Sequence, residues 1–225
     1  TRYGSPLAYA RPLELLGKDG LADLSGRRVL DFGCGGVGPI RMMATLGADA
    51  VGVDVDPMLA ALFSRPEDLG PVGERGRVSL VIGRYPADAA IAARVGGGFD
   101  LVLAKNTLKR GYVHPASGRA FIDLGMDDVA FLRTIHRDLR PGGRVMIYNL
   151  SPAPSPPGQP FKPMADGRSP FSRGDWEAAG LRVEAFDRDD TAAAREMGRV
   201  FGWDKSGTDL EHDLFATYTL ARKPE

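Results

Sequence analysis

Residues 29–39 read VLDFGCGGVGP, an apolar strand that runs into a cluster of glycines and then a proline. Glycine lets a backbone turn tightly and approach a ligand closely. In open α/β sheets a turn of this kind lies at the carboxyl edge of the strands, where ligands bind. The stretch therefore predicts an α/β domain with a ligand site around residues 33–38.

Apolar strand-like runs alternate with Ala-rich helical runs along the rest of the chain. This alternation predicts a doubly wound, seven-stranded and mostly parallel sheet with helices on both faces, a Rossmann-like fold. Strands are expected at residues 28–32, 50–54, 77–82, 99–104, 144–150, 181–186 and 214–220, the last one antiparallel. Helices are expected at residues 39–46, 57–64, 86–95, 127–139 and 191–203.

The length of 225 residues favours one domain over residues 1–225. Three segments interrupt the alternation. Residues 1–27, with Tyr3, Tyr9 and Arg11, are expected to form an N-terminal lid. Residues 105–126 and the proline-rich residues 151–171 are too long for simple connections and are expected to form active-site loops.

The composition excludes several classes of protein. Lys and Arg number 29 and Asp and Glu number 29, so the chain lacks the basic surplus of a nucleic-acid binder. Cys34 is the single cysteine, so no intrachain disulfide is possible. No apolar run is long enough to span a membrane. These features predict a cytoplasmic protein without a membrane partner.

Asp54 follows Gly33 by 21 residues and ends an apolar strand. A carboxylate at this position can accept hydrogen bonds from both hydroxyls of a ribose, which indicates a nucleoside-containing cofactor. Gly33, Gly35 and Gly38 fit the dinucleotide pattern G-x-G-x-x-G. However, Asp31 would repel a pyrophosphate and attract the ammonium and sulfonium groups of S-adenosylmethionine. The charge of Asp31 therefore favours S-adenosylmethionine.

With these residues the sequence resembles the class I S-adenosylmethionine-dependent methyltransferases. The resemblance is carried by residues 31–35 (DFGCG), 51–56 (VGVDVD), 99–102 (FDLV) and 139–143 (LRPGG). It implies that the methionine end of the cofactor is held by Asp31, Gly33, Cys34 and Gly35. It also implies that Asp54 and Val55 lie at the ribose and that Lys105 lies beside the methyl group.

The sequence departs from the family pattern at two positions. Val37 stands where the family most often has a third glycine. Arg84 stands where the family usually offers an acid to the adenine amino group, and Tyr85 follows it. Arg84 and Tyr85 are therefore the candidates for contacting the adenine, with Asp88 a little further along the chain.

Basic and titratable side chains gather after the strand that is expected to face the methyl group. The candidate catalytic residues are Lys105, Tyr112 and His114, with His114 as a base near neutral pH. The candidate acceptor-binding residues are Lys109, Arg110, Arg119 and Asn149. Phe161, Phe171 and Trp176 are expected to form an aromatic wall over the acceptor. The competing interpretation of residues 105–119 is a solvated surface loop.

These features predict a methyltransferase that uses S-adenosyl-L-methionine and acts on a small molecule, with the basic loop favouring an anionic acceptor. Methylation of oxygen and of nitrogen both remain open. Residues 105–108 (KNTL) replace the Asn-Pro-Pro-Tyr of many amino-group methylases of nucleic acid and protein. No metal site is expected, because the three histidines lie far apart. The alternatives are a non-catalytic S-adenosylmethionine or nucleoside sensor and an NAD-dependent oxidoreductase.

Overall fold

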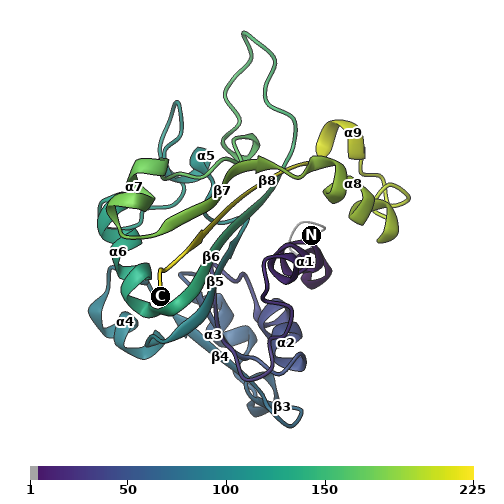
Figure 1. The fold of residues 1–225 in the computed structure, drawn as a ribbon. Helices are drawn as coiled ribbons and strands as arrows, with labels where there is room; N and C mark the ends of the chain where they lie inside the picture. Colours follow the sequence, from purple (N-terminus) through teal and green to yellow (C-terminus); the bar gives the residue numbers. More distant parts are fainter. Residues whose placement is uncertain (1–4) are drawn as a thin grey trace.

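Eight strands form one mixed sheet within residues 5–225, the part of the chain that the structure, a computed structural model, describes (Figure 1). Their spatial order is β3-β4-β2-β1-β5-β6-β8-β7. Neighbours from β4 to β6 run parallel, whereas β3 and β8 are antiparallel to the strands beside them. The strands are β1 (Arg28–Phe32), β2 (Asp49–Asp54), β3 (Gly70–Val72), β4 (Gly76–Ile82), β5 (Phe99–Lys105), β6 (Leu139–Ser151), β7 (Arg182–Asp189) and β8 (Phe215–Arg222).

The expectation of seven strands was wrong by one, while the antiparallel last strand is confirmed. The additional strand, β3, pairs antiparallel with β4 at the edge of the sheet. It has three residues with Pro71 at its centre, so it carries no alternating apolar pattern. Proline is tolerated in a strand at a sheet edge, where its missing N–H costs no ladder hydrogen bond.

All five predicted helices are present, with shifted ends. They are α2 (Val37–Thr45), α3 (Met58–Leu62), α4 (Ala89–Val95), α6 (Asp128–Asp138) and α8 (Thr191–Val200). Helix α4 begins later than residue 86 because the Asp88 carboxylate accepts hydrogen bonds from two amides of the first turn. Sequence reasoning did not assign η1 (Pro6–Tyr9), α1 (Ala10–Lys18), η2 (Pro66–Asp68), α5 (Arg110–Val113), η3 (Pro163–Ala165), α7 (Arg173–Ala178) and α9 (Leu210–Asp213).

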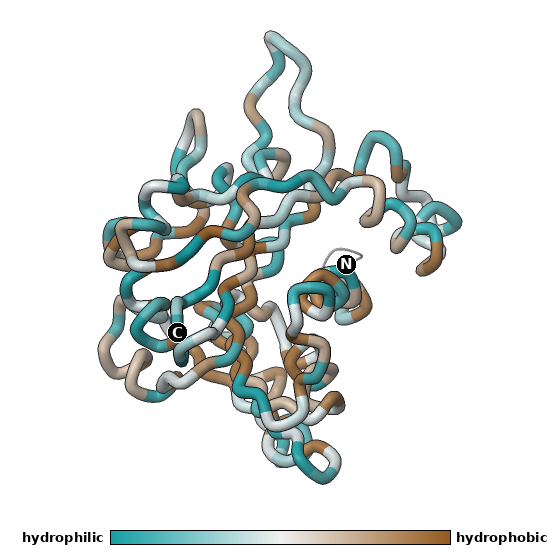
Figure 2. Tube along the Cα trace, in the orientation of Figure 1, coloured by the Kyte–Doolittle hydropathy of each residue, from teal (hydrophilic) through white to brown (hydrophobic). Residues whose placement is uncertain are grey.

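The central strands are buried on both faces. On β1, Val29 packs with α1 and α2, and Leu30 packs with the opposite layer of α4, α6 and α7. This alternation follows from the two-residue repeat of a strand. Figure 1 shows the two helical layers on either side of the sheet, and Figure 2 shows apolar residues concentrated along the central strands. The parallel strands therefore end together at one edge, where polar side chains can meet.

Phe171 and Trp176 belong to the interior and do not form the expected aromatic wall. Phe171 stacks on Phe131 with 5.4 Å between ring centroids, and Trp176 meets Phe171 edge-on at 5.6 Å. Both aromatic side chains are at most 1% exposed. Their large apolar area is used to pack α6 and α7 onto the sheet.

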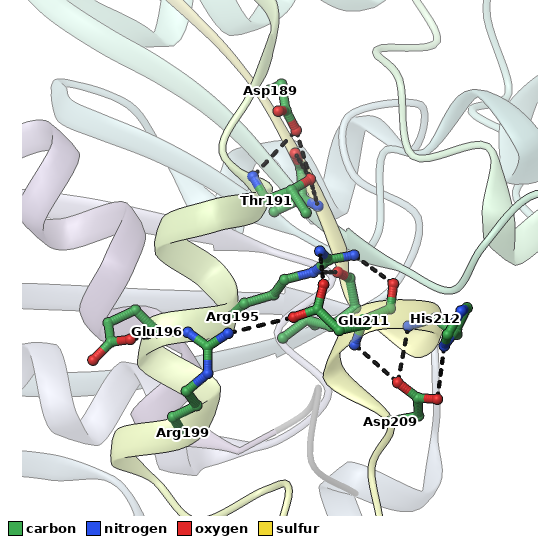
Figure 3. Close-up of polar contacts among 10 residues, drawn as sticks. Asp189, Thr191, Arg195, Glu196, Arg199, Asp209, Glu211 and His212 are labelled. Carbon is green, nitrogen blue, oxygen red and sulfur yellow. Dashed lines mark hydrogen bonds and ion pairs between the residues drawn. The ribbon is translucent and has the colours of Figure 1, made fainter.

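Helices α8 and α9 form an extension beside the N-terminal segment. Arg195 of α8 pairs with Glu211 of α9 and donates to the backbone oxygen of Leu214 at 3.1 Å, while Arg199 lies 3.4 Å from the same Glu211 carboxylate (Figure 3). A small apolar core beneath these contacts joins α8 and α9 to Ala8 and to β6. The extension therefore packs on both the sheet and the N-terminal segment.

Buried charge also connects α1 to the start of α8. The Arg11 guanidinium donates to both carboxylate oxygens of Asp190, at 2.8 and 2.6 Å. The Tyr148 hydroxyl donates to the same carboxylate at 2.9 Å. These contacts fix the N-terminal segment across the carboxyl end of the sheet.

No helix within the described residues 5–225 has both the length and the apolar character needed to cross a membrane.

Candidate active site

A cavity of about 520 Å³ lies at the carboxyl ends of β1 and β5. Residues 33–39 of the glycine-rich turn form one side, and residues 105–107 at the end of β5 form another. Tyr9 closes it from the N-terminal segment, while Lys109 and Tyr112 line it from the loop after β5. The structure therefore brings three of the expected regions together around one cavity. Tyr3, also assigned to the lid, lies outside the described residues.

Gly33 and Gly35 have different roles in the turn. Both adopt the left-handed conformation, with φ of 69° and 62°. A Cβ at Gly33 would lie 2.4 Å from the Thr107 side chain, whose hydroxyl donates to the Gly33 oxygen at 3.1 Å. A Cβ at Gly35 would have nothing within 4 Å. Gly33 thus allows close packing against the loop after β5, whereas Gly35 borders open space that a ligand can fill.

The Asp54 carboxylate holds the turn in place. One carboxylate oxygen accepts a hydrogen bond from the Gly35 amide at 2.8 Å, and the other accepts from the Asp56 amide at 3.1 Å. The contact brings the end of β2 against the glycine-rich turn, so the carboxylate expected at a ribose lies beside the glycines. Val55 follows and is 68% exposed.

Asp31 is fully buried beside the turn. Its Oδ2 accepts a hydrogen bond from the Tyr9 hydroxyl at 2.9 Å, while Oδ1 has no hydrogen-bond partner in the described part of the chain. Burial raises the pKa of Asp31 to about 7, against the opposing effects of the Tyr9 hydrogen bond and the Lys105 charge. A buried acceptor without a partner is uncommon, and here it would stabilise a cationic donor.

Lys105 ends β5 and faces the same group of residues. Its ammonium lies 5.1 Å from the centroid of the Tyr9 ring, a cation–π distance. Burial lowers the pKa of Lys105 to about 8, and the negative charge of Asp31 partly offsets this effect. Burial also raises the pKa of Tyr9 well above its ordinary value, so Tyr9 remains a hydrogen-bond donor.

Lys109 anchors the proline-rich segment. Its ammonium donates to the backbone oxygens of Leu150 at 2.6 Å and Met164 at 3.2 Å, and lies 5.3 Å from the Tyr112 ring centroid. Burial, with a smaller contribution from the positive charge of Lys105, lowers the pKa of Lys109 to about 8. The described lining of the cavity thus holds two ammonium groups, while the Asp31 carboxylate lies behind it.

Comparison with known proteins gives partial sequence matches. Magnesium-protoporphyrin O-methyltransferase from Rhodobacter capsulatus is 39% identical over 103 residues, which is 46% of this chain and 42% of the relative. Ubiquinone biosynthesis O-methyltransferase from Burkholderia orbicola is 33% identical over 148 residues, 65% of this chain and 54% of the relative. The chain thus spans about half the length of the curated relatives it matches. No family model matches the sequence.

Solved structures match over nearly the whole chain. Phosphoethanolamine N-methyltransferase 2 from Haemonchus contortus, in complex with phosphomonomethylethanolamine and S-adenosylhomocysteine, has a TM-score of 0.58 at 19% identity and covers 96% of this chain and 53% of its own. An S-adenosylmethionine-dependent methyltransferase from Mesorhizobium loti has a TM-score of 0.54 at 19% identity, covering 96% and 97% of the two chains. The chain has the class I methyltransferase fold. These matches confirm the resemblance that the motifs indicated.

Several residues predicted from the loop after β5 lie outside the cavity of this methyltransferase fold. His114 is partly exposed, and its Nε2 lies 2.9 Å from the Asp128 carboxylate. Arg110 and Arg119 are exposed and do not line the cavity. The Tyr112 backbone oxygen accepts hydrogen bonds from Phe121 and Ile122, which fold this loop back on itself. Some residues of the loop therefore line the cavity, and the others lie at the protein surface.

The Asn149 amide forms hydrogen bonds with the two loops and does not line the cavity. It donates to the backbone oxygens of Leu108 at 2.9 Å and Gly167 at 2.8 Å. Asn149 is only 1% exposed and does not line the cavity. Its position joins the segments after β5 and β6.

The residues expected to contact adenine have other partners. Arg84 lies 3.3 Å from Asp123 at the surface, and the buried Tyr85 hydroxyl donates to Asp138 at 2.8 Å. Neither lines the glycine-rich cavity. Cys34 does line it but is 5% exposed, and burial raises the pKa of its thiol to about 12, so it packs as a small apolar group.

The proline-rich segment lines a second cavity. This cavity of about 580 Å³ lies over the ends of β6 and β8 and is bordered by Pro152, Phe161, Phe215 and Thr217. None of these residues lines the glycine-rich cavity. Residues 151–171, expected as an active-site loop, are connected to the glycine-rich cavity through Lys109.

Sequence reasoning missed several residues that line the site. Asn106 and Thr107 directly follow β5, so their position at a strand end was a usable signal. Pro6 and Phe63 also line the cavity, as does Tyr9, which the sequence places only in the N-terminal lid. These three side chains arrive through tertiary packing, which no local pattern records.

Proposed function

We propose that this chain binds S-adenosyl-L-methionine in the glycine-rich cavity and transfers its methyl group to a small molecule. The observation that carries the proposal is the open space at Gly35, bounded by an amide that the Asp54 carboxylate holds at 2.8 Å. A nucleoside in this place would have a carboxylate for its ribose and a glycine turn for close approach.

The buried Asp31 supports this cofactor over a dinucleotide. Its Oδ1 has no partner in residues 5–225, and the Tyr9 hydroxyl occupies the other oxygen. The ammonium and sulfonium charges of S-adenosylmethionine are attracted by this carboxylate, whereas a pyrophosphate is repelled. The buried Asp31 carboxylate therefore fits the cofactor that the fold implies.

Different residues would have different roles in such a site. The glycine-rich turn admits the cofactor, Asp54 orients the ribose, and Asp31 stabilises the positive charge of the methionine end. Bound S-adenosylmethionine supplies an electrophilic methyl group. Tyr9 and the N-terminal segment cover the cavity and exclude water, which favours a fixed alignment of the reacting groups.

The acceptor is proposed to be a small molecule acted on in the cytoplasm. The equal numbers of acidic and basic residues do not favour a nucleic acid, and the single cysteine, Cys34, suits a reducing compartment. The names of the relatives refer to magnesium-protoporphyrin and to ubiquinone biosynthesis, which supports a small acceptor.

The role of Asp54 tests the proposal. Asp54→Ala should weaken binding of S-adenosylhomocysteine by about 1.5–3 kcal/mol, the range for hydrogen bonds to a charged group. Isothermal titration calorimetry measures the affinity, and urea denaturation checks that the variant is folded. Glu74→Gln, at an exposed acid between β3 and β4, is the matched control and should bind like the parent. Unchanged affinity in folded Asp54→Ala would reject the assigned ribose site.

A further inference from the structure

The second cavity, of about 580 Å³, lies apart from the glycine-rich cavity. Among the described residues 5–225, none lines both cavities. Lys109 lines the glycine-rich cavity, and its ammonium donates to the backbone oxygens of Leu150 and Met164. The next residues in the chain, Ser151 and Ala165, line the second cavity. The buried Lys109 side chain therefore lies between the two cavities.

Hydrogen bonds hold the walls of the second cavity. The Ser155 hydroxyl donates to the backbone oxygen of Pro160 at 2.6 Å, which closes a loop within the proline-rich segment. The Thr217 hydroxyl of β8 donates to the backbone oxygen of Gly167 at 2.7 Å, which joins the later part of this segment to the sheet. Prolines add stiffness because their φ is fixed. The cavity is therefore shaped before a ligand binds, which lowers the cost of ordering its walls.

The lining of the second cavity is mostly apolar and includes one buried hydroxyl. The rings of Pro152, Pro154, Phe161 and Phe215 border the cavity. Ser151, at the end of β6, also borders it and is 4% exposed, and its Oγ has no hydrogen-bond partner in the described part of the chain. Buried hydroxyls almost always have a partner. Ser151 therefore supplies a hydrogen-bonding group for a ligand.

The charges at this cavity favour an anion. Arg168 and Asp166 are bonded to each other at 2.8 and 2.9 Å. The Asp189 carboxylate accepts hydrogen bonds from the Thr191 amide and hydroxyl, at 3.1 and 2.5 Å. Lys162 is exposed and has no hydrogen bond or ion pair within residues 5–225. Lys162 is therefore the charged group of the described lining that is left to pair with a ligand.

We propose that the second cavity is a binding site for a small anion with an apolar ring system, separate from the site of methyl transfer. Its rings pack between the prolines and Phe161, the Ser151 hydroxyl forms a hydrogen bond with it, and its anionic group pairs with Lys162. The volume suits a small molecule, because pockets for such ligands measure about 300–1,000 Å³. A cationic ligand would be repelled by Lys162 and would find both acids already bonded. The proposal does not depend on the proposed function.

The test uses 1-anilinonaphthalene-8-sulfonate, an aromatic anion that becomes fluorescent in apolar surroundings. Titration of the folded protein should give one saturable site. Phe161→Ala removes a ring from the cavity wall and should weaken binding by about tenfold. Phe121→Ala is the matched control, because Phe121 is 72% exposed and lines neither cavity, and it should bind like the parent.

A second probe isolates the contribution of charge. N-phenyl-1-naphthylamine has the same rings without the sulfonate. Lys162→Gln should weaken binding of the sulfonate about three- to fivefold, the effect of one exposed ion pair, and should leave binding of the neutral probe unchanged. Lys205→Gln, at an exposed lysine beyond α8, is the matched control and should bind both probes like the parent. Urea denaturation checks that every variant is folded.

Saturation with S-adenosylhomocysteine tests whether the two sites are separate. The affinity for 1-anilinonaphthalene-8-sulfonate should be the same with and without it. Failure of S-adenosylhomocysteine to bind would reject the proposed function alone, and the Phe161 and Lys162 variants would still locate the anion site.

Three results would overturn the proposal. The first is displacement of 1-anilinonaphthalene-8-sulfonate by S-adenosylhomocysteine, which would place the probe in the glycine-rich cavity. The second is parent affinity in folded Phe161→Ala. The third is an equal loss of affinity for both probes in Lys162→Gln, which would remove the role assigned to its charge.

Discussion

The Tyr9 hydroxyl donates a hydrogen bond of 2.9 Å to the buried Oδ2 of Asp31. This contact joins the N-terminal segment to the first strand of the sheet, directly beside the glycine-rich turn. It partly offsets the cost of burying the carboxylate, because a hydrogen bond to the charged form favours that form. The Tyr9 hydroxyl therefore couples the N-terminal segment to the buried charge beside the glycine-rich cavity.

The raised pKa of Asp31 predicts a pH-dependent stability. Asp31 has a pKa of about 7 when folded, against an ordinary value of 3.8. Between these values the folded state holds more protons than the unfolded state, so Asp31 makes stability fall as the pH rises. Relative to Asp31→Asn, the free energy of unfolding of the parent should fall by up to about 1.4 kcal/mol per pH unit between pH 4 and 7. Above pH 7 the difference between the two proteins should stay constant. Urea denaturation at each pH measures the difference. A difference independent of pH would show that Asp31 is not perturbed by burial.

The two glycines of the turn should respond differently to alanine. Gly33→Ala adds a methyl group 2.4 Å from Thr107 at a φ of 69°, so it combines a clash with backbone strain. Gly35→Ala adds strain alone, at about 1–2 kcal/mol. We expect Gly33→Ala to lower the free energy of unfolding more, and Gly35→Ala to lower S-adenosylhomocysteine affinity while the protein stays folded. Urea denaturation and calorimetry measure the two effects, and the reverse order of stability would contradict the assigned roles.

The Arg11–Asp190 pair should stabilise the fold more than the surface pair on the same helix. Arg11→Met leaves the Asp190 carboxylate with Tyr148 but without its cation, at a cost of about 3 kcal/mol. Lys18→Met removes an exposed pair with Glu14 and should cost about 0.5 kcal/mol or less. Chemical denaturation of the two variants gives both values. Equal effects would mean that the buried network does not hold the N-terminal segment.

The elements predicted most accurately are those with a continuous local signal. The strand expected at residues 28–32 matches β1, because an apolar run bounded by Arg28 and the glycine cluster leaves little choice of ends. Helix α1 has only its short apolar face to indicate it, and β3 consists of a glycine, a proline and a valine. The positions of α1 and β3 depend on the elements they pack against, and a local sequence pattern carries no information on those contacts.

Some residues of the site were predicted correctly and others were not, and the difference again depends on local sequence signals. Gly33 and Gly35 lie just after β1 and Lys105 ends β5, and ligands of open α/β sheets bind at the carboxyl ends of the strands, so the sequence placed all three at the cavity. Arg110, His114 and Arg119 lie further along the loop, which hydrogen bonds to the Tyr112 backbone oxygen fold back on itself, and they do not line the cavity. Tyr9 reaches the cavity from a segment far away in the sequence. Distance from a strand end therefore decided how well a site residue could be predicted.

The central claim is that the glycine-rich cavity takes S-adenosylmethionine, and competitive calorimetry tests it most directly. The protein is titrated with S-adenosylhomocysteine alone, with NAD alone, and with each ligand in the presence of the other. The account predicts saturable binding of S-adenosylhomocysteine with a stoichiometry of about one, at the glycine-rich cavity, and no heat from NAD. Saturable binding of NAD together with no binding of S-adenosylhomocysteine would contradict it.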